Sequence, residues 1–98
     1  MTPEQSLKRA LKDFIERHGG YWIAVTGGPW SKPGDPDMVA FFRDGRFIGI
    51  EAKTRDGVQS AIQFRRQREI ENRGGVYLLV RSVEDLENGL RDRGITYD

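Results

Sequence analysis

Three ionisable residues stand at positions where short apolar strands would normally carry hydrophobic side chains: Asp37, Glu51 and Lys53. Glu51 and Lys53 are two residues apart, so on one strand their side chains project from the same face. Two carboxylates held together repel each other, and such a pair typically binds a hard divalent cation. A bound metal polarises a phosphoryl oxygen, and a neighbouring lysine stabilises charge that develops on the phosphate. These residue types suit phosphodiester hydrolysis. We call the three residues the acid–lysine cluster.

The composition limits which metal such a site would bind. The chain has 98 residues, no cysteine and a single histidine, His18. Zinc sites need nitrogen or sulfur ligands that this chain lacks, so Mg²⁺ or Mn²⁺ is the expected cofactor. The same counts exclude a disulfide framework and disfavour a Ser-His-Asp triad. The alternative interpretation is a salt-bridge cluster at the end of a strand.

The turn between two apolar runs decides where Asp37 points. Asp44 and Gly45 separate the runs, which is typical of a β-hairpin. With a two-residue loop, Asp37 falls opposite Ala52 and points to the wrong face. With a three-residue loop, Asp37 falls opposite Glu51, and Gly45 takes the position that needs a left-handed backbone. We predict the three-residue loop, which also gathers one apolar face: Met38, Ala40, Ile48, Ile50 and Ala52.

The elements that must position these residues follow from helix caps, hydrophobic spacing and turn residues. The patterns predict helices and strands in the order α-β-β-β-α-β-α. We expect helices over residues 3–18, 61–72 and 83–90, and strands over 21–25, 37–42, 47–53 and 76–80. A crossover helix joins the last two strands, so these should be parallel if they are neighbours. The fold class is α/β, a small mixed sheet with helices on both sides, in a single domain over residues 1–98.

The motifs in this order resemble the PD-(D/E)xK nuclease superfamily and, within it, the VRR-NUC family. The resemblance covers nearly the whole chain, from about Pro3 to Leu90. Each motif is weak alone, but together in this order they are specific. They are Gly34-Asp35-Pro36-Asp37 as G-x-P-D, Glu51-Ala52-Lys53 as E-x-K, Ser60-Ala61-Ile62-Gln63 at a helix start, and an ending at Gly74-Gly75-Val76 and Val80 to Asp85.

The resemblance implies a restriction-endonuclease-like core and a role for each cluster residue. Asp37 and Glu51 would be metal ligands, the Ala52 carbonyl a third ligand, and Lys53 the catalytic lysine. Asp35, in the variable position of G-x-P-D, departs from the pattern and adds an acid near the metal.

Two further residues have roles that the resemblance leaves open. Family members carry an acid on the first helix, and Glu4 fits that position, with Glu16 as a second candidate. The alternative for Glu4 is an ordinary acid that the helix dipole favours. Gln63 could steady the lysine or a water, or it could be an ordinary polar residue of a first helical turn.

The basic residues suggest a surface for a polyanion, although the net charge is only +1. We expect phosphate contacts, which fix position rather than read sequence, from Arg65, Arg66, Arg68, Lys32 and Lys8. The alternative is a solvated helix face with ion pairs along it.

The aromatic residues are expected to be mostly structural. Trp30 lies in a loop rich in glycine and proline, where we expect it to pack against the sheet. Its alternative role is to stack on a base or to wedge into a branch point. We expect His18 to be a helix-end residue rather than a base. We expect core or dimer contacts from Phe14, Trp22, Phe41, Phe42 and Phe47.

The function implied by the resemblance is a metal-dependent, structure-selective DNA endonuclease similar to Holliday-junction resolvases and acting as a homodimer. Alternatives are a non-catalytic DNA-binding module on the same fold and an RNA-directed nuclease, which the residues do not distinguish. The chain lacks an apolar run of membrane-spanning length and the apolar core of a signal peptide, so an intracellular protein is expected. By analogy, it would come from a phage or a bacterial host.

Overall fold

Local sequence patterns place the helices and strands almost where the structure has them. The structure is a computed structural model that describes residues 1–97. The order α-β-β-β-α-β-α is confirmed, and the first three strands are one or two residues shorter than expected. The elements are α1 (Pro3–Arg17), β1 (Tyr21–Ala24), β2 (Met38–Phe41), β3 (Ile48–Ala52), α2 (Ala61–Asn72), β4 (Val76–Val80) and α3 (Val83–Asp92).

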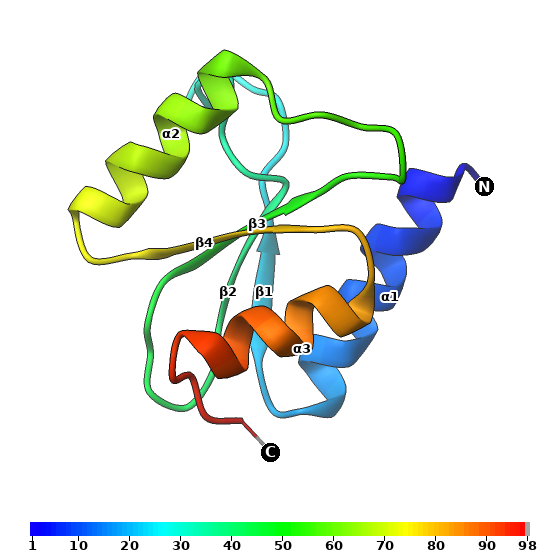
Figure 1. Ribbon diagram of the computed structural model, residues 1–98, viewed down its shortest axis with the longest axis vertical. Helices are drawn as coiled ribbons and strands as arrows, with labels where there is room; N and C mark the ends of the chain where they lie inside the picture. Colours follow the sequence, from blue (N-terminus) through cyan, green and yellow to red (C-terminus); the bar gives the residue numbers. More distant parts are fainter. Residues whose placement is uncertain (98) are drawn as a thin grey trace.

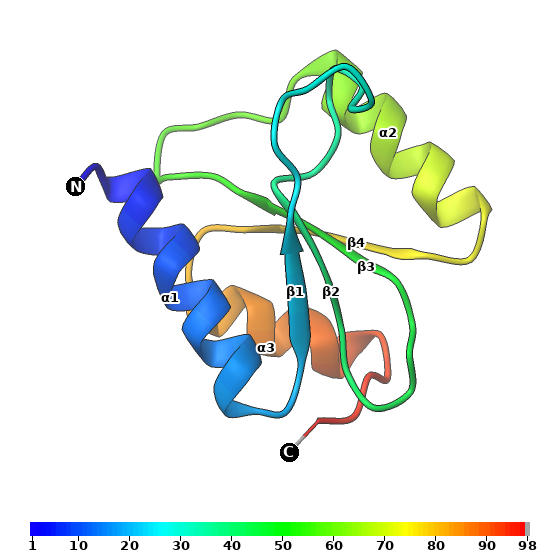
Figure 2. The ribbon, with the colours of Figure 1, turned by 180° about the vertical axis from the view of Figure 1, so that it is seen from behind.

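The strands form one four-stranded sheet in the order β1-β2-β3-β4 (Figure 1). The first two pairings are antiparallel, whereas β3 and β4 are parallel and joined through α2, as predicted. Leu78 of β4 lies against Gly89 of α3, and Gly49 on the opposite face of β3 lies near Ile70 of α2. The helices therefore cover both faces, with α1 and α3 together on one side (Figure 2).

The hydrophobic core lies between the sheet and the pair α1 and α3. The five residues predicted to share the apolar face of the β2–β3 hairpin are all buried there. Leu11 and Ile15 from α1 and Leu86 and Leu90 from α3 are fully buried against that face. This core holds β2 and β3 in position. The acid–lysine cluster lies where β2 begins and β3 ends.

The hairpin has the predicted three-residue loop. Met38 pairs with Ile50, and the Gly45 amide donates to the Phe42 carbonyl at 3.0 Å. Gly45 adopts a φ of 73°, the left-handed conformation that the loop requires. The same register places Asp37 opposite Glu51.

The aromatic residues divide between the core and the surface. Phe14 and Phe42 are in the core, whereas Phe41 and Phe47 are 38% and 44% exposed, so for these two a dimer contact stays a prediction. The expectation that Trp30 packs against the sheet is wrong, because its side chain is 95% exposed. Nothing in the local sequence of a Gly/Pro loop determines whether its tip turns toward the sheet or away from it.

Trp22 is half-buried over α1. Its indole Nε1 donates to Glu16 at 2.9 Å, and the Lys12 ammonium lies 4.5 Å from the centre of its ring. Within residues 1–97, no helix is both long and apolar enough to cross a membrane.

Candidate functional site

The acid–lysine cluster forms where β2 begins and β3 ends. Asp37 directly precedes β2, Glu51 lies in β3, and Lys53 directly follows the last residue of β3. The Asp37 carboxylate accepts a hydrogen bond from the Ala52 amide at 2.8 Å through Oδ2. The Asp37 amide in turn donates to the Ile50 carbonyl at 3.0 Å. Backbone pairing of the two strands thus fixes the Asp37 carboxylate beside Glu51.

Glu51 is buried with part of its hydrogen-bonding capacity unused. The residue is only 4% exposed, and its Oε1 is buried without a hydrogen-bond partner among the described residues. Burial, and then the charge of neighbouring Asp37, raises the pKa of the Glu51 carboxyl to about 8. A buried acceptor without a donor is costly, and a cation bound there would relieve both the desolvation and the repulsion. The site therefore fits a divalent metal.

Lys8 lies at the edge of this site, with its side chain 29% exposed. Its Nζ is 3.3 Å from Asp37 Oδ1 and 3.2 Å from Glu4 Oε2. Burial opposes the charge of Lys8, but the contacts with Glu4 and Asp37 outweigh it and raise its pKa above the usual value. The structure places the Lys8 ammonium between two carboxylates, and the predicted DNA contact of Lys8 remains a prediction.

Replacing Lys8 with methionine is expected to tighten binding of Mn²⁺ by roughly fivefold or more, because a positive charge beside Asp37 repels an incoming cation by about 1 kcal/mol or more. Isothermal titration of metal into both proteins measures this. Lys12→Met is the matched control, since Lys12 lies over Trp22. Equal or weaker Mn²⁺ binding by Lys8→Met would show that Lys8 does not oppose the metal.

The candidate acids of α1 are placed differently from each other. Glu4 and Asp37 both form ion pairs with Lys8, whereas Glu16 accepts a hydrogen bond from Trp22. Within residues 1–97, no three His, Asp or Glu side chains come together in a way that would hold a metal. The cluster thus brings together two carboxylates, Asp37 and Glu51, and the Ala52 carbonyl, the expected third ligand, is a backbone atom.

The loop after β3 supports Lys53, and a residue that sequence analysis missed holds this loop in place. A side-chain atom added at Gly57 would lie 3.2 Å from Lys53 Cδ, so this loop packs closely on the lysine stem. The Arg81 guanidinium donates to the carbonyls of Thr54 and Gly57, each at 2.7 Å. Arg81 directly follows β4, which is parallel to β3, and this position could have indicated that Arg81 lies near the loop after β3. Arg81 therefore positions the segment that carries Lys53.

Gln63 makes local contacts in the structure. Its side-chain oxygen accepts from the Ser60 amide at 2.9 Å, and the Ser60 hydroxyl accepts from the Gln63 amide at 3.2 Å. This reciprocal pair is a capping box at the start of α2. Any role of Gln63 toward Lys53 or a water remains a prediction.

The predicted DNA-contacting cations of α2 divide into two groups. Arg65 and Arg68 are exposed. Arg66 is largely covered and bridges Glu69 at 2.8 Å and Asp35 at 3.8 Å, which ties α2 to the loop before β2. Lys32 is exposed and lines a hollow of about 230 Å³ beside Arg66. Arg65, Arg68 and Lys32 are therefore open to solvent, while Arg66 is held in ion pairs, and their predicted phosphate contacts remain predictions.

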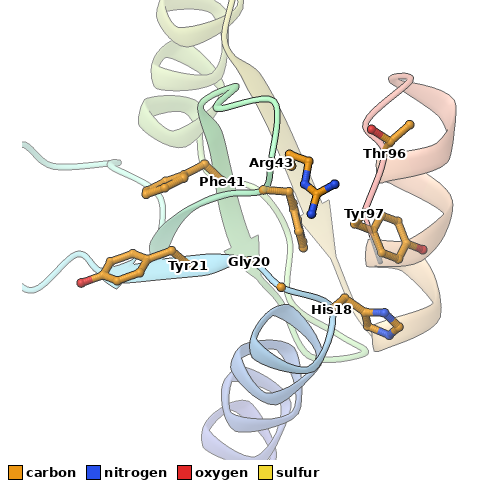
Figure 3. A pocket seen from close by; sticks show the side chains of 9 residues that line it. His18, Gly20, Tyr21, Phe41, Arg43, Thr96 and Tyr97 are labelled. Atoms are coloured by element: carbon orange, nitrogen blue, oxygen red, sulfur yellow. The ribbon is translucent and has the colours of Figure 1, made fainter.

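A larger hollow, of about 620 Å³, lies at the other end of the β1–β2 pair (Figure 3). It is lined in part by His18, Tyr21, Phe41 and Tyr97. His18 caps the C-terminus of α1, as expected, and its ring packs against Phe14 and Tyr97. The acid–lysine cluster is not part of this hollow, so its geometry, rather than cavity size, identifies the candidate site.

The fold of the chain is similar to that of a solved structure. No family model matches the sequence, and no curated protein matches it. Among the solved structures that match, one described as a VRR_NUC domain superposes with a TM-score of 0.78 at 22% sequence identity. The superposition covers 94% of this chain and 97% of the other. The chain therefore has the fold of a VRR_NUC domain.

Proposed function

We propose that this protein is a metal-dependent deoxyribonuclease of the VRR-NUC family. The observation that carries the proposal is the buried Glu51 carboxylate, with an unpartnered oxygen, held beside Asp37 and facing the charge of Lys53. Such an arrangement costs folding free energy, and a salt-bridge cluster would not need to bury an acid in this way. The likeness in fold supports the same family.

The residues have distinct roles in this proposal. Asp37, Glu51 and the Ala52 carbonyl would hold Mg²⁺ or Mn²⁺, which supplies Lewis-acid polarisation of the phosphate and a bound water of lowered pKa. Lys53 stabilises the negative charge that develops on the phosphate as the P–O bond breaks. Gln63 would steady Lys53 or the water, and Glu4 would assist as the acid of α1.

The substrate we propose is branched or otherwise structured DNA. Lys32, Arg65 and Arg68 would contact phosphates, and phosphate contacts orient a duplex without reading its sequence. We also propose a homodimer, whose two sites would act on opposing strands. The edge strand β1 and its exposed Tyr21 and Ile23 offer a surface for the second copy. We also propose that the protein acts inside a bacterial or phage-infected cell, where such DNA forms.

The test is cleavage of a labelled four-way junction and a matched linear duplex with Mg²⁺, with Mn²⁺ and with a chelator. We expect cutting that requires metal, and faster cutting of the junction than of the duplex. Binding of both DNAs without cleavage in either metal would instead support a non-catalytic binding module. Cleavage of a matched RNA alone would support the RNA-directed alternative.

A further inference from the structure

Trp30 is the most exposed large hydrophobic side chain within residues 1–97. Its exposed fraction is 95%, against 78% for the next, Met1 and Val58. The second tryptophan, Trp22, shows the ordinary arrangement, with its N–H bonded and its ring partly covered. A fully exposed indole is not stabilised by packing within the fold, and tryptophan is enriched at interfaces with other molecules.

Two consecutive turns hold the Trp30 ring outward. The Ser31 amide donates to the Gly28 carbonyl at 3.2 Å, so Pro29 and Trp30 are the central residues of the first turn. The Ser31 hydroxyl reinforces it by accepting from the Gly28 amide at 3.0 Å. Proline in the first central position restricts the backbone further. Trp30 is therefore presented on a restrained turn rather than on a flexible tip.

The second turn anchors the first one to α2. It spans Lys32 to Asp35, where the Asp35 amide donates to the Lys32 carbonyl at 3.1 Å and Gly34 adopts a φ of 85°. Gly34 lies against the backbone of Ile62 in α2, and Asp35 faces Arg66. Figures 1 and 2 both show the segment between β1 and β2 beside the start of α2. Trp30 is thus fixed relative to this helix.

The same segment leads directly into the acid–lysine cluster. It ends at Asp37, seven residues after Trp30. Lys32 lies on it, and the exposed residues Phe64, Arg65 and Arg68 lie on the helix to which it is anchored. Aromatic rings combined with cations are the combination that binds unpaired nucleic acid, because every base can stack and every phosphate is charged.

We propose that Trp30 stacks on an unpaired nucleobase of the substrate and so selects DNA that has an unstacked base near the cleaved phosphate. The inference rests on the proposed nuclease function and specifies its substrate. Trp30 makes no contact that the fold needs, so it acts on substrate choice and not on the chemical step.

The test compares DNA binding by wild type and Trp30→Ala in chelator, where a metal-dependent nuclease cannot cut. The ligands are a fully paired duplex and the same duplex carrying a short single-stranded flap. Stacking is worth about 1–3 kcal/mol per base, so Trp30→Ala should bind the flap roughly 5- to 150-fold more weakly. Its affinity for the paired duplex should change less than about twofold, and Trp30→Phe should retain most of the flap binding.

Two controls separate stacking from indirect effects. Phe47→Ala removes a partly exposed aromatic ring that directly precedes β3, at the end of the strand opposite the cluster, and its flap-to-duplex ratio should equal that of wild type. In a Trp22→Phe background, Trp30 is the remaining tryptophan, and its fluorescence should be quenched by a single-stranded oligonucleotide. Unchanged melting temperature of Trp30→Ala would show that the fold is intact.

The outcomes distinguish this inference from the proposed function. An equal flap-to-duplex ratio in wild type and Trp30→Ala overturns the stacking role, even if wild type cuts DNA in metal. Loss of the flap preference in Trp30→Ala supports it, even if wild type cuts no substrate. Absence of flap binding by wild type overturns the stacking role, whereas the proposed nuclease function fails only if wild type also cuts no DNA with Mg²⁺ or Mn²⁺.

Discussion

Replacing Lys53 with methionine is expected to lower metal-dependent cleavage by about a hundred- to a thousandfold while leaving the fold and DNA affinity nearly unchanged. Methionine keeps the length and apolar stem that pack on Gly57 but removes the charge that faces Glu51. A donor aimed at developing charge typically contributes this much to the rate. Single-turnover cleavage at saturating Mg²⁺ measures the chemical step apart from product release.

Two controls make the Lys53 result specific. Lys53→Arg keeps the charge but changes its shape, and should recover only part of the rate. Arg65→Met removes one exposed cation of α2 and should weaken DNA binding rather than slow single-turnover cleavage at saturating protein. If Lys53→Met cuts at the wild-type rate, the lysine has no role in the chemistry and the cluster interpretation fails.

Replacing Glu51 with glutamine is expected to have two opposite effects: loss of cleavage and a gain in stability at alkaline pH. The pKa of Glu51 is about 8 in the fold, against an ordinary value of 4.5. Between these values the folded protein holds a proton that the unfolded chain has lost. The free energy of unfolding therefore falls as pH rises from about 4.5 to 8, and the loss is complete above pH 8.

Glutamine cannot ionise, so the variant escapes this loss. Urea unfolding in chelator should show Glu51→Gln clearly more stable than wild type at pH 9, with a much smaller difference near pH 5. Adding Mn²⁺ at pH 9 should stabilise wild type and leave Glu51→Gln nearly unaffected, because the variant lacks one carboxylate ligand. If the difference in stability between Glu51→Gln and wild type were the same at pH 5 and at pH 9, Glu51 would not be a buried carboxyl with a raised pKa.

Much of the fold could be predicted because local chemistry determines it. Ser60 and Gln63 form the capping box that begins α2, and Gly45 supplies the left-handed residue of the hairpin. That single glycine separates the two possible registers, and only the observed one sets Asp37 beside Glu51. The pairing of the two acids was therefore predictable from sequence, although their roles in metal binding remain predictions.

The parts that sequence missed depend on how elements pack together. Lys8 reaches Asp37 because of the angle at which α1 crosses the sheet, and no spacing along α1 records that angle. Arg66 meets Asp35 for the same reason across a different interface. Arg81 bonds to carbonyls 24 to 27 residues earlier in the chain. The exposure of Trp30 likewise depends on where the anchored turn lies relative to α2.

Gly34 has a consequence for how such a protein can change over time. A side chain there would come within 2.7 Å of the Ile62 carbonyl, so the chain from Gly34 onward is locked to α2. Upstream, a side chain at Gly27 would meet nothing within 4 Å. We therefore expect a substitution at Gly27 to be tolerated and one at Gly34 to shift the segment away from α2. Under the proposed function, the turn that carries Trp30 is the part of this segment where exchanges would alter substrate preference while Asp37 stays in place.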